Sequence, residues 1–251
     1  MGSLWRQQTR QRPVKASRLS GAPSKGVRWP NLGRLLALGL SLVLGLLLSC
    51  TPSPSKPTLL IYGDSLTVLS EPEVTQLYEA KYHLVFQAAG GTAMCDWAGH
   101  ARTDRIVYHP SAVVLAFTGN LDGCVRPDYN RAKLAGVVAN YERNLRAFAA
   151  SFAGLPVKVI APPAMNNTSP NYQGWYPYNG NPAILDMYKN VSAELGLTYS
   201  TAADDTLTPG HKYTAYRPAY GTTAPLVLVR YSDGVHVTPA GAVYYAHALA
   251  G

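Results

Sequence analysis

The sequence is poor in cysteine and has no apolar run of membrane-spanning length. Its 251 residues include three cysteines and no Cys-x-x-Cys pair, so a zinc site built from cysteine ligands is not expected. Neither a P-loop nor a Gly-x-Gly-x-x-Gly fingerprint occurs, which leaves no common motif for binding a nucleotide. The sequence therefore implies no metal and no cofactor. With 47% hydrophobic residues, it is still rich enough in apolar side chains to build a core of ordinary size.

Acidic residues are absent from the first 34 positions. This segment carries eight Lys and Arg residues, whereas the rest carries 14 basic and 14 acidic side chains, so the net charge of +8 belongs to the N-terminus alone. The charge is therefore no sign of nucleic-acid binding, and no nucleic-acid partner is expected. An uncharged apolar stretch at 35–48 follows. As a helix it would be about 21 Å long, short of the ~30 Å hydrocarbon core of a bilayer. We expect a signal peptide over 1–49, with its basic region at 1–34 and its apolar region at 35–48.

Cys50 directly follows the expected signal peptide. The four residues that end in it, Leu-Leu-Ser-Cys, resemble a bacterial lipobox, in which the cysteine becomes the lipidated first residue of the mature protein. Residues 50–57 are rich in Pro and Ser, which suits a short, stiff tether between an anchor and a folded domain. We therefore expect an exported protein of the cell envelope, held at the membrane through Cys50. A secreted protein with a plain signal peptide, or an uncleaved anchor with its basic arm in the cytoplasm, are the alternatives.

Export makes the two remaining cysteines informative. Cys95 and Cys124 form an even pair, and cysteines of exported proteins are commonly joined in the oxidising compartment that they reach. We predict a disulfide between them. Two buried free thiols are the alternative.

Short apolar runs alternate with longer mixed stretches from position 58 onward. Strands are expected at 58–62, 83–87, 112–117, 157–161 and 198–200. Helices are expected at 68–81, 131–152, 183–195 and 239–249. Strands that alternate with helices of this length are typical of βαβ units, so we predict one α/β domain over 58–251 with a central parallel sheet.

Two stretches do not fit this alternation. Residues 163–182 and 206–225 are rich in Asn, Tyr, Pro and Gly, and we expect both to be long loops without regular structure of their own. The first loop interleaves aromatic side chains with amides, a combination that suits the apolar faces and hydroxyl edges of sugar rings. The expected substrate contacts are Tyr172, Trp175, Tyr176, Tyr178 and, outside this loop, Trp97. The alternative is a loop that packs on its own aromatic side chains.

A serine follows the first expected strand. A Gly-Asp-Ser turn ends at Ser65 directly after the apolar run 58–62, which puts the serine at the carboxyl edge of the sheet, where open α/β sheets bind ligands. Near the C-terminus, Asp233 and His236 stand three residues apart. A serine hydroxyl needs a base to become a nucleophile, and a histidine oriented by an aspartate supplies that base. The two segments together indicate a serine hydrolase.

These two motifs resemble those of the SGNH, or GDSL-type, hydrolases, a family of esterases and acyl-hydrolases. The resemblance covers about 58–249 and implies a flavodoxin-like three-layer α/β/α sandwich. It also implies that Ser65 is the nucleophile, that His236 takes the serine proton and that Asp233 orients the imidazole. The Gly-x-Ser-x-Gly elbow of the α/β-hydrolases is absent.

The resemblance further implies an oxyanion hole. One donor is a backbone N–H near a glycine after the second strand, for which Gly91 is preferred and Gly90 is the alternative. Another is an asparagine side chain after the third strand. Asn120 fills that place, although the family's Gly-x-Asn-Asp block reads Gly-Asn-Leu-Asp here. The alternative is a turn asparagine without this role. The Ser65 N–H would be a third donor, and the expected disulfide would join the two loops that carry the other donors.

We therefore expect an exported serine esterase that forms an acyl-enzyme on Ser65. Its expected partner is an acylated carbohydrate or another ester, and its expected reaction is the removal or transfer of a short acyl group, such as acetyl, on a glycan or glycolipid of the cell envelope. Hydrolysis and transfer differ in whether water or a sugar hydroxyl attacks the acyl-enzyme, and the sequence leaves both open. The competing class is a non-catalytic glycan-binding protein with an SGNH-like fold.

Overall fold

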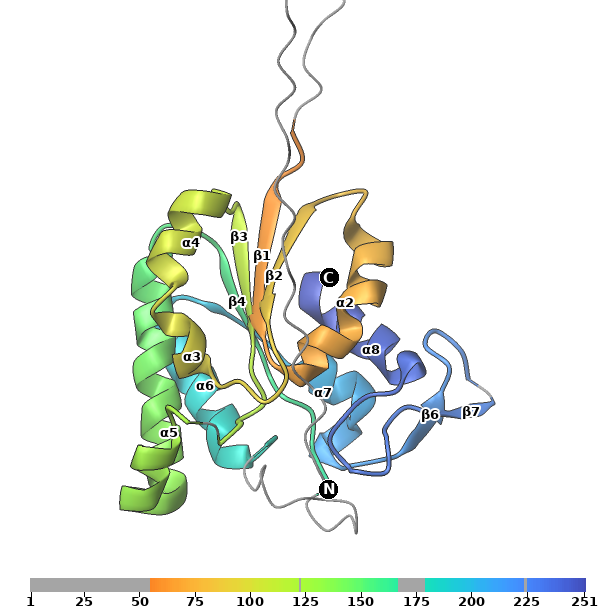
Figure 1. Ribbon diagram of the computed structural model, residues 1–251. Coiled ribbons are helices and arrows are strands. Elements are labelled where there is room, and N and C mark those ends of the chain that lie inside the picture. Colours follow the sequence, from red (N-terminus) through yellow and green to blue (C-terminus); the bar gives the residue numbers. More distant parts are fainter. Residues whose placement is uncertain (1–54, 122, 167–178, 224) are drawn as a thin grey trace, which may run out of the picture. The chain divides into compact units, whose positions relative to one another are not determined.

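The computed structural model describes residues 55–121, 123–166, 179–223 and 225–251 (Figure 1). The expected signal peptide at 1–49, Cys50 and most of the tether at 50–57 lie outside these residues. So do four of the aromatic side chains expected to contact substrate: Tyr172, Trp175, Tyr176 and Tyr178. None of the described helices combines the length and the apolar character that a membrane span requires.

A single five-stranded parallel sheet forms the centre of the described domain, in the order β2-β1-β3-β4-β5. The strands are β1 Thr58–Gly63, β2 His83–Ala88, β3 Ala112–Ala116, β4 Val157–Ile160 and β5 Thr198–Ser200. Each of the five expected strands is confirmed to within one residue at either end. The strand order reverses between β1 and β3, and in open α/β sheets such a reversal opens a crevice at the carboxyl ends of the strands.

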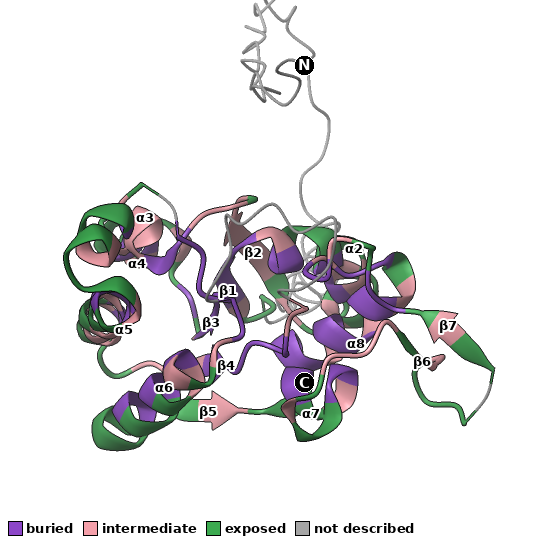
Figure 2. Ribbon diagram, turned by 90° about the horizontal axis from the view of Figure 1, so that it is seen from below, coloured by how far each residue is buried: buried purple, intermediate pink, exposed green. Residues whose placement is uncertain are grey.

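Helices cover both faces of the sheet (Figure 1). One face carries α3 Met94–Ala98, α4 Ala101–Tyr108, α5 Arg126–Ser151 and α6 Pro182–Leu195. The other carries α2 Ser65–Tyr78, α7 Ala202–Leu207 and α8 Pro239–Ala250. Alternate strand residues feed the two cores: Leu60 and Tyr62 pack on the first face, and Leu59 and Ile61 on the second. The buried strands between exposed outer helix faces in Figure 2 give the three-layer α/β/α sandwich that was predicted.

Two of the long helices begin earlier than expected, and α2 also ends earlier, at Tyr78 rather than at 81. α2 begins at Ser65 rather than at 68, because Asp64 caps it, and α5 begins at Arg126 rather than at 131, with Pro127 in its first turn. α5 is interrupted by non-helical backbone at Ala132 and Lys133, close to where the expected helix begins. The helices α3, α4 and α7 were not expected, because each is short and has few buried residues.

The expectation that 206–225 lacks regular structure is wrong. This stretch holds the last residues of α7 and a short 3-10 turn at Pro209–His211. It also contains β6 Tyr216–Pro218, which pairs antiparallel with β7 Leu226–Leu228. A ring stack between Tyr220 and His247, with centroids 4.1 Å apart, holds this hairpin on α8.

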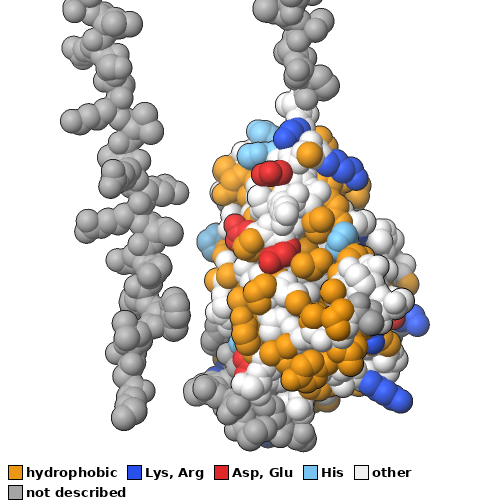
Figure 3. Space-filling model, turned by 90° about the vertical axis from the view of Figure 1, so that its right-hand side faces the viewer, with side chains coloured by type: hydrophobic (Ala, Val, Ile, Leu, Met, Phe, Trp, Pro, Cys, Tyr) orange, Lys and Arg blue, Asp and Glu red, His pale blue; other side chains and the backbone are white. Residues whose placement is uncertain are grey.

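The β6–β7 hairpin presents apolar side chains to solvent. Tyr216, Leu226 and Leu228 of the hairpin are exposed, as is Tyr231 just after it. Figure 3 views the molecule from this side and shows apolar side chains gathered on the face that carries the hairpin. In sequence, this hairpin is directly followed by the segment 229–238, which contains Asp233 and His236.

Candidate active site

Ser65 is the first residue of α2 and stands just past the end of β1. Asp64 is the N-cap of this helix, and its Oδ1 accepts the Leu66 N–H at 3.1 Å, so the helix starts at the serine. Gly63 has no room for a side chain, because an added Cβ would lie 2.0 Å from the hydroxyl oxygen of Thr67. The Gly-Asp-Ser sequence is therefore what turns the chain sharply from strand into helix and leaves the hydroxyl at the carboxyl edge of the sheet.

The structure brings the serine, the histidine and the aspartate together. His236 Nε2 lies 3.0 Å from Ser65 Oγ, and His236 Nδ1 lies 2.6 Å from Asp233 Oδ2. The second carboxylate oxygen, Oδ1, accepts the backbone N–H groups of Val235 at 2.9 Å and of His236 at 3.0 Å. Asp233 thus uses one oxygen for the ring and the other for its own loop, which fixes the direction of the imidazole.

The charge on Asp233 sets the tautomer of the ring. Burial alone raises the pKa of this carboxyl, but the hydrogen bonds from the His236 ring and from the Val235 and His236 N–H groups outweigh it and hold the pKa of Asp233 below its usual value. The carboxylate is therefore ionised at neutral pH, and its partner Nδ1 carries the proton. Nε2 is then left with a lone pair directed at Ser65 Oγ, which is the arrangement that a general base requires.

Backbone donors surround the serine. As the first residue of α2, Ser65 has no intrahelical acceptor for its N–H, and the partial positive charge of a helix N-terminus favours an anion there. The turn after β2 lies alongside, since a Cβ added to Gly90 would be 4.0 Å from the Ser65 Cβ. Gly91 has a φ of +79°, in the left-handed region that favours glycine. Which of the two glycines donates to an oxyanion stays a prediction.

Asn120 reaches the same place, but its amide is engaged. The side chain is buried, Nδ2 donates to Thr92 O at 2.9 Å and to Asp64 Oδ2 at 3.3 Å, and Oδ1 accepts from Asn179 Nδ2 at 2.9 Å. Both amide protons therefore have acceptors within the protein. To bind an oxyanion, Nδ2 would have to give up one of them, and the longer contact with Asp64 is the easier to exchange. The oxyanion role of Asn120 stays a prediction.

Asp64 ties the end of β1 to the end of β3. It is fully buried, and its Oδ2 accepts both the N–H and the hydroxyl of Thr118 at 2.7 Å each. Burial raises the pKa of Asp64 above its usual value, while the hydrogen bonds from Thr118 and Leu66 oppose this shift. Because its contacts are with the framework around Ser65, Asp64 holds the two strand ends in register.

Sequence reasoning missed the residues that orient Asn120. Asn179 Nδ2 contacts Thr118 Oγ1 at 3.2 Å in addition to Asn120, and the Gly180 N–H donates to Thr118 O at 2.8 Å. Asn179 belongs to the Asn- and Tyr-rich stretch 163–182, and this composition was the only available signal. The last described part of that stretch is therefore fixed to the segment that follows β3.

A second histidine–aspartate pair supports the same region. His211 Nδ1 lies 2.9 Å from Asp204 Oδ1, and His211 Nε2 lies 2.8 Å from Gly180 O. Both partners are acceptors, so both contacts are hydrogen bonds only when the ring carries both protons. Asp204 Oδ1 also accepts the Ala164 N–H at 3.3 Å. The pair therefore joins α7 to the backbone at Gly180 and Ala164 and belongs to the framework. No group of three or more His, Cys, Asp or Glu side chains in the described part of the chain is placed to hold a metal ion.

Cys95 and Cys124 form a disulfide, with their Cα atoms 6.1 Å apart. The bond joins α3 to the turn before α5, and so links the segments that follow the glycine turn and the asparagine. Trp97 lies in this region, half-buried against the hydrophobic core, and its indole N–H donates to Thr92 Oγ1 at 3.1 Å. These contacts of Trp97 are internal, and its contact with substrate stays a prediction.

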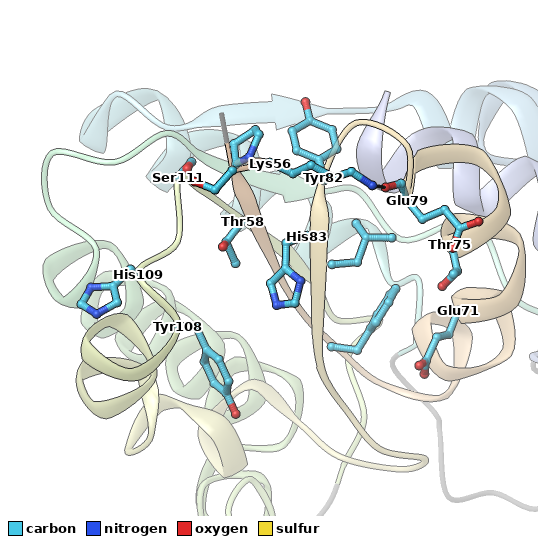
Figure 4. A pocket seen from close by; sticks show the side chains of 14 residues that line it. Lys56, Thr58, Glu71, Thr75, Glu79, Tyr82, His83, Tyr108, His109 and Ser111 are labelled. Atoms are coloured by element: carbon cyan, nitrogen blue, oxygen red, sulfur yellow. Dashed lines mark hydrogen bonds between the residues drawn. The ribbon is translucent and has the colours of Figure 1, made fainter. Parts of the chain in front are cut away.

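A large groove lies along the edge strand β2, away from this site. It encloses about 1040 Å³ between α2 and α4, and the first residues of β1 and β2, Thr58 and His83, line it (Figure 4). Ser65 follows the opposite end of β1. The groove is therefore separate from the pocket that the serine would use.

The strand order, with helices on both faces of the sheet, agrees with the fold that the resemblance to the SGNH, or GDSL-type, hydrolases implies, and solved structures of other proteins share it. A lipase/acylhydrolase from Enterococcus faecalis has this fold with a TM-score of 0.53 and 17% sequence identity, over 76% of this chain and 92% of that one. A catalytic mutant of an acetylxylan esterase from Geobacillus stearothermophilus gives a TM-score of 0.52 and 16% identity, over 77% and 92%. At such identities the likeness shows the fold.

The family is shown by sequence. The model of the family described as "Protein of unknown function (DUF459)" matches residues 58–251, and the chain therefore belongs to this family. No curated protein sequence matches the chain. The reaction is therefore inferred from the geometry of the site.

Proposed function

We propose that the protein is a serine esterase that forms an acyl-enzyme on Ser65 and removes or transfers short acyl groups on a glycan or glycolipid. The observation that carries this proposal is the hydrogen-bonded chain from Ser65 Oγ through His236 to Asp233, at 3.0 and 2.6 Å. It stands at the carboxyl edge of the sheet, beside the strand-order reversal where open α/β sheets bind ligands. The likeness to a lipase/acylhydrolase and an acetylxylan esterase supports the same class of reaction.

In the first half of the proposed reaction, Ser65 Oγ attacks the acyl carbonyl carbon while its proton passes to His236 Nε2. Asp233 stabilises the imidazolium that forms. The tetrahedral oxyanion is met by the Ser65 N–H at the N-terminus of α2 and by a glycine N–H of the turn after β2. Collapse of this intermediate breaks the bond to the alcohol oxygen, which takes the proton from His236. The products of this half are an acyl ester on Ser65 and the free alcohol.

In the second half, a water molecule or a sugar hydroxyl attacks the acyl carbon. His236 Nε2 takes its proton and then returns it to Ser65 Oγ as the acyl ester breaks. Water gives the free acid, and a sugar hydroxyl gives a new ester. Hydrolysis and transfer therefore use the same protein groups and differ only in which acceptor the site admits.

An acylated carbohydrate is the proposed substrate. The stretch 163–182 carries the sequence's best match to a sugar-contacting surface, with Tyr172 and Trp175 among its aromatic residues. The last described part of this stretch is hydrogen-bonded to the site, because Asn179 Nδ2 donates to Asn120 Oδ1. This contact supports a role of the stretch in binding the alcohol part of an ester held at Ser65.

We propose in addition that the protein is exported, with a signal peptide at 1–49 and a lipid on Cys50 that anchors it through the tether 50–57. The basic segment, the short apolar stretch and the Leu-Leu-Ser-Cys sequence support this. The intact mass of the mature protein from a bacterial envelope fraction tests it. A mass equal to residues 50–251 plus a diacylglyceryl group is expected, whereas an unmodified N-terminus would leave a secreted form or an uncleaved anchor.

The test of the chemistry is covalent labelling of the full chain, kept in mild detergent, with a fluorophosphonate, followed by peptide mass spectrometry. An adduct on Ser65 is expected, and it should disappear in Ser65→Ala and in His236→Ala. A folded protein without an adduct on Ser65 would favour the competing class, a glycan-binding protein with the same fold. If Ser65 is labelled, acetylated oligosaccharides are next offered to the unlabelled wild-type protein. Release of acetate or formation of a new acetyl ester is the readout.

A further inference from the structure

Arg230 is the largest fully buried side chain of the described residues. It begins the loop 230–237, whose two ends pair as a bridge between Arg230 and Val237. No ion pair of the described residues includes Arg230. Taking a cation out of water without a direct counter-ion is unfavourable, so other contacts have to compensate for its burial.

The contacts of this guanidinium are with two backbone segments. One terminal nitrogen donates to Val235 O, and the other donates to Ala164 O at 3.1 Å. The first nitrogen also lies 3.6 Å from Met165 Sδ. A planar guanidinium can hold two acceptors at fixed separation, which a single ammonium cannot do. Arg230 therefore clamps the loop 230–237 to the segment that follows β4.

The clamped loop carries the acid and the base of the site. Val235 lies between Asp233 and His236 in sequence, so a bond to its carbonyl restrains the peptide groups on both sides. A backbone bond from the Asn166 N–H to Gly234 O, at 2.9 Å, adds a second tie from the same β4 segment. Bonds within the loop to Asp233 fix the direction of the imidazole, and these cross-links fix the loop itself to the rest of the domain.

The charge of Arg230 acts on the same groups. The titratable side chains that interact with it are Tyr213, Tyr245, Asp233 and Asp204. Burial lowers the pKa of Arg230 to about 10, so the side chain stays protonated at neutral pH. A buried positive charge favours the ionised form of Asp233, the carboxylate that orients the His236 ring.

We propose that Arg230 is a positioning residue for the reaction at Ser65: it holds the His236 loop against the β4 segment and so fixes the place of the base. This inference rests on the proposed function, since it gives Arg230 a part in serine activation. An arginine that merely fills space in the core would influence the stability of the fold and nothing else.

The experiment compares the full chain with Arg230→Met and Arg230→Lys, and measures the rate of fluorophosphonate labelling of Ser65 from pH 5 to 9. Arg105→Met is the matched control, because Arg105 also donates to a backbone carbonyl, that of Ser151, but on the opposite face of the sheet. Thermal unfolding reports whether each variant is folded. In parallel, the NMR signals of the His236 ring are recorded, a readout of the surroundings of the ring that does not need Ser65 to react.

In folded Arg230→Met we expect labelling to slow by at least about tenfold, because a small misplacement of the base is enough for such a loss. We expect the NMR signals of the His236 ring to move, because the ring changes its place relative to Asp233 and Ser65. Arg230→Lys should also label slowly, because a single ammonium cannot hold both carbonyls. Arg105→Met should behave like the wild type.

A wild-type chain that is folded and not labelled would contradict the proposed function. A labelled wild type with an equally reactive Arg230→Met, whose His236 ring signals are unchanged, would overturn the role of Arg230. If Arg230→Met does not fold, Arg230→Lys decides: a wild-type rate overturns the proposal, and a slow rate with moved His236 signals supports it.

Discussion

The serine and the histidine reach the same point in space by different means. Ser65 is fixed by its immediate neighbours, since Gly63 permits the tight turn and Asp64 caps the helix that the serine begins. His236 sits on a loop that is held by its own bonds to Asp233 and also by two ties to the segment after β4, from Arg230 to Ala164 O and from the Asn166 N–H to Gly234 O. The nucleophile is thus built locally, whereas the base also depends on tertiary contacts. Changes near Ser65 should therefore act through the turn, and changes around His236 should act through distant partners.

The largest expected effect follows from removing the reacting group of the nucleophile or of the base. Ser65→Ala and His236→Ala should each lower the hydrolysis of 4-nitrophenyl acetate by roughly 10⁴-fold or more, because nucleophile and base act as a unit. The double variant should be no worse than either single one. Unfolding midpoints close to the wild type would show that the loss is chemical. Independent, multiplying losses in the double variant would argue that the two residues do not work together.

The next effect concerns the disulfide, which supports the segments after β2 and β3 rather than either reacting residue. Reduction of Cys95–Cys124, which are 29 residues apart, should lower the free energy of unfolding by about 3–4 kcal/mol. Urea unfolding with and without a reductant measures this. The mass of the reduced protein should rise by two hydrogens. A stability that does not change on confirmed reduction would contradict the prediction.

A smaller effect is expected at the turn itself. Gly63→Ala should lower the free energy of unfolding by about 1–3 kcal/mol, because the added Cβ would lie 2.0 Å from Thr67 Oγ1 and 3.0 Å from Ala116 O. Gly99→Ala is the control, since a Cβ there meets nothing within 4 Å, and its effect should stay within about 0.5 kcal/mol. Equal effects of the two substitutions would show that the turn tolerates a side chain and that the local description of Ser65 is wrong.

The smallest expected effect is on how the free energy of unfolding depends on pH, through Asp233 in the His236 loop. The folded-state pKa of Asp233 is lowered, mainly by the hydrogen bonds that outweigh its burial. Its contribution to stability is therefore fully present above the unfolded value of about 3.9 and is lost as pH falls through the folded pKa. Urea unfolding between pH 6 and pH 2.5 should show a shallower acid decline in Asp233→Asn than in the wild type. Identical declines would mean that the loop does not hold this carboxylate.

The difference between contacts with near neighbours and contacts with distant residues also explains what the sequence could predict. The five strands and Ser65 follow from short-range patterns, an apolar run followed by Gly-Asp-Ser, and these were placed correctly in the fold. Arg230 and Asn179 could not be found, because their partners Ala164 and Asn120 lie 66 and 59 residues away. The β6–β7 hairpin was missed because its strands are three residues long, and one of them contains a proline.

The ends of the described domain lie away from its reactive edge. Thr58 opens β1, six residues before the turn to Ser65, a length of about 20 Å. Gly251 O accepts from Lys158 Nζ in β4, and Gly251 lies with Leu59 and Thr198 around one small hollow at the other end of the sheet. A support joined to the domain at either of these points is therefore attached at the end of the sheet opposite Ser65.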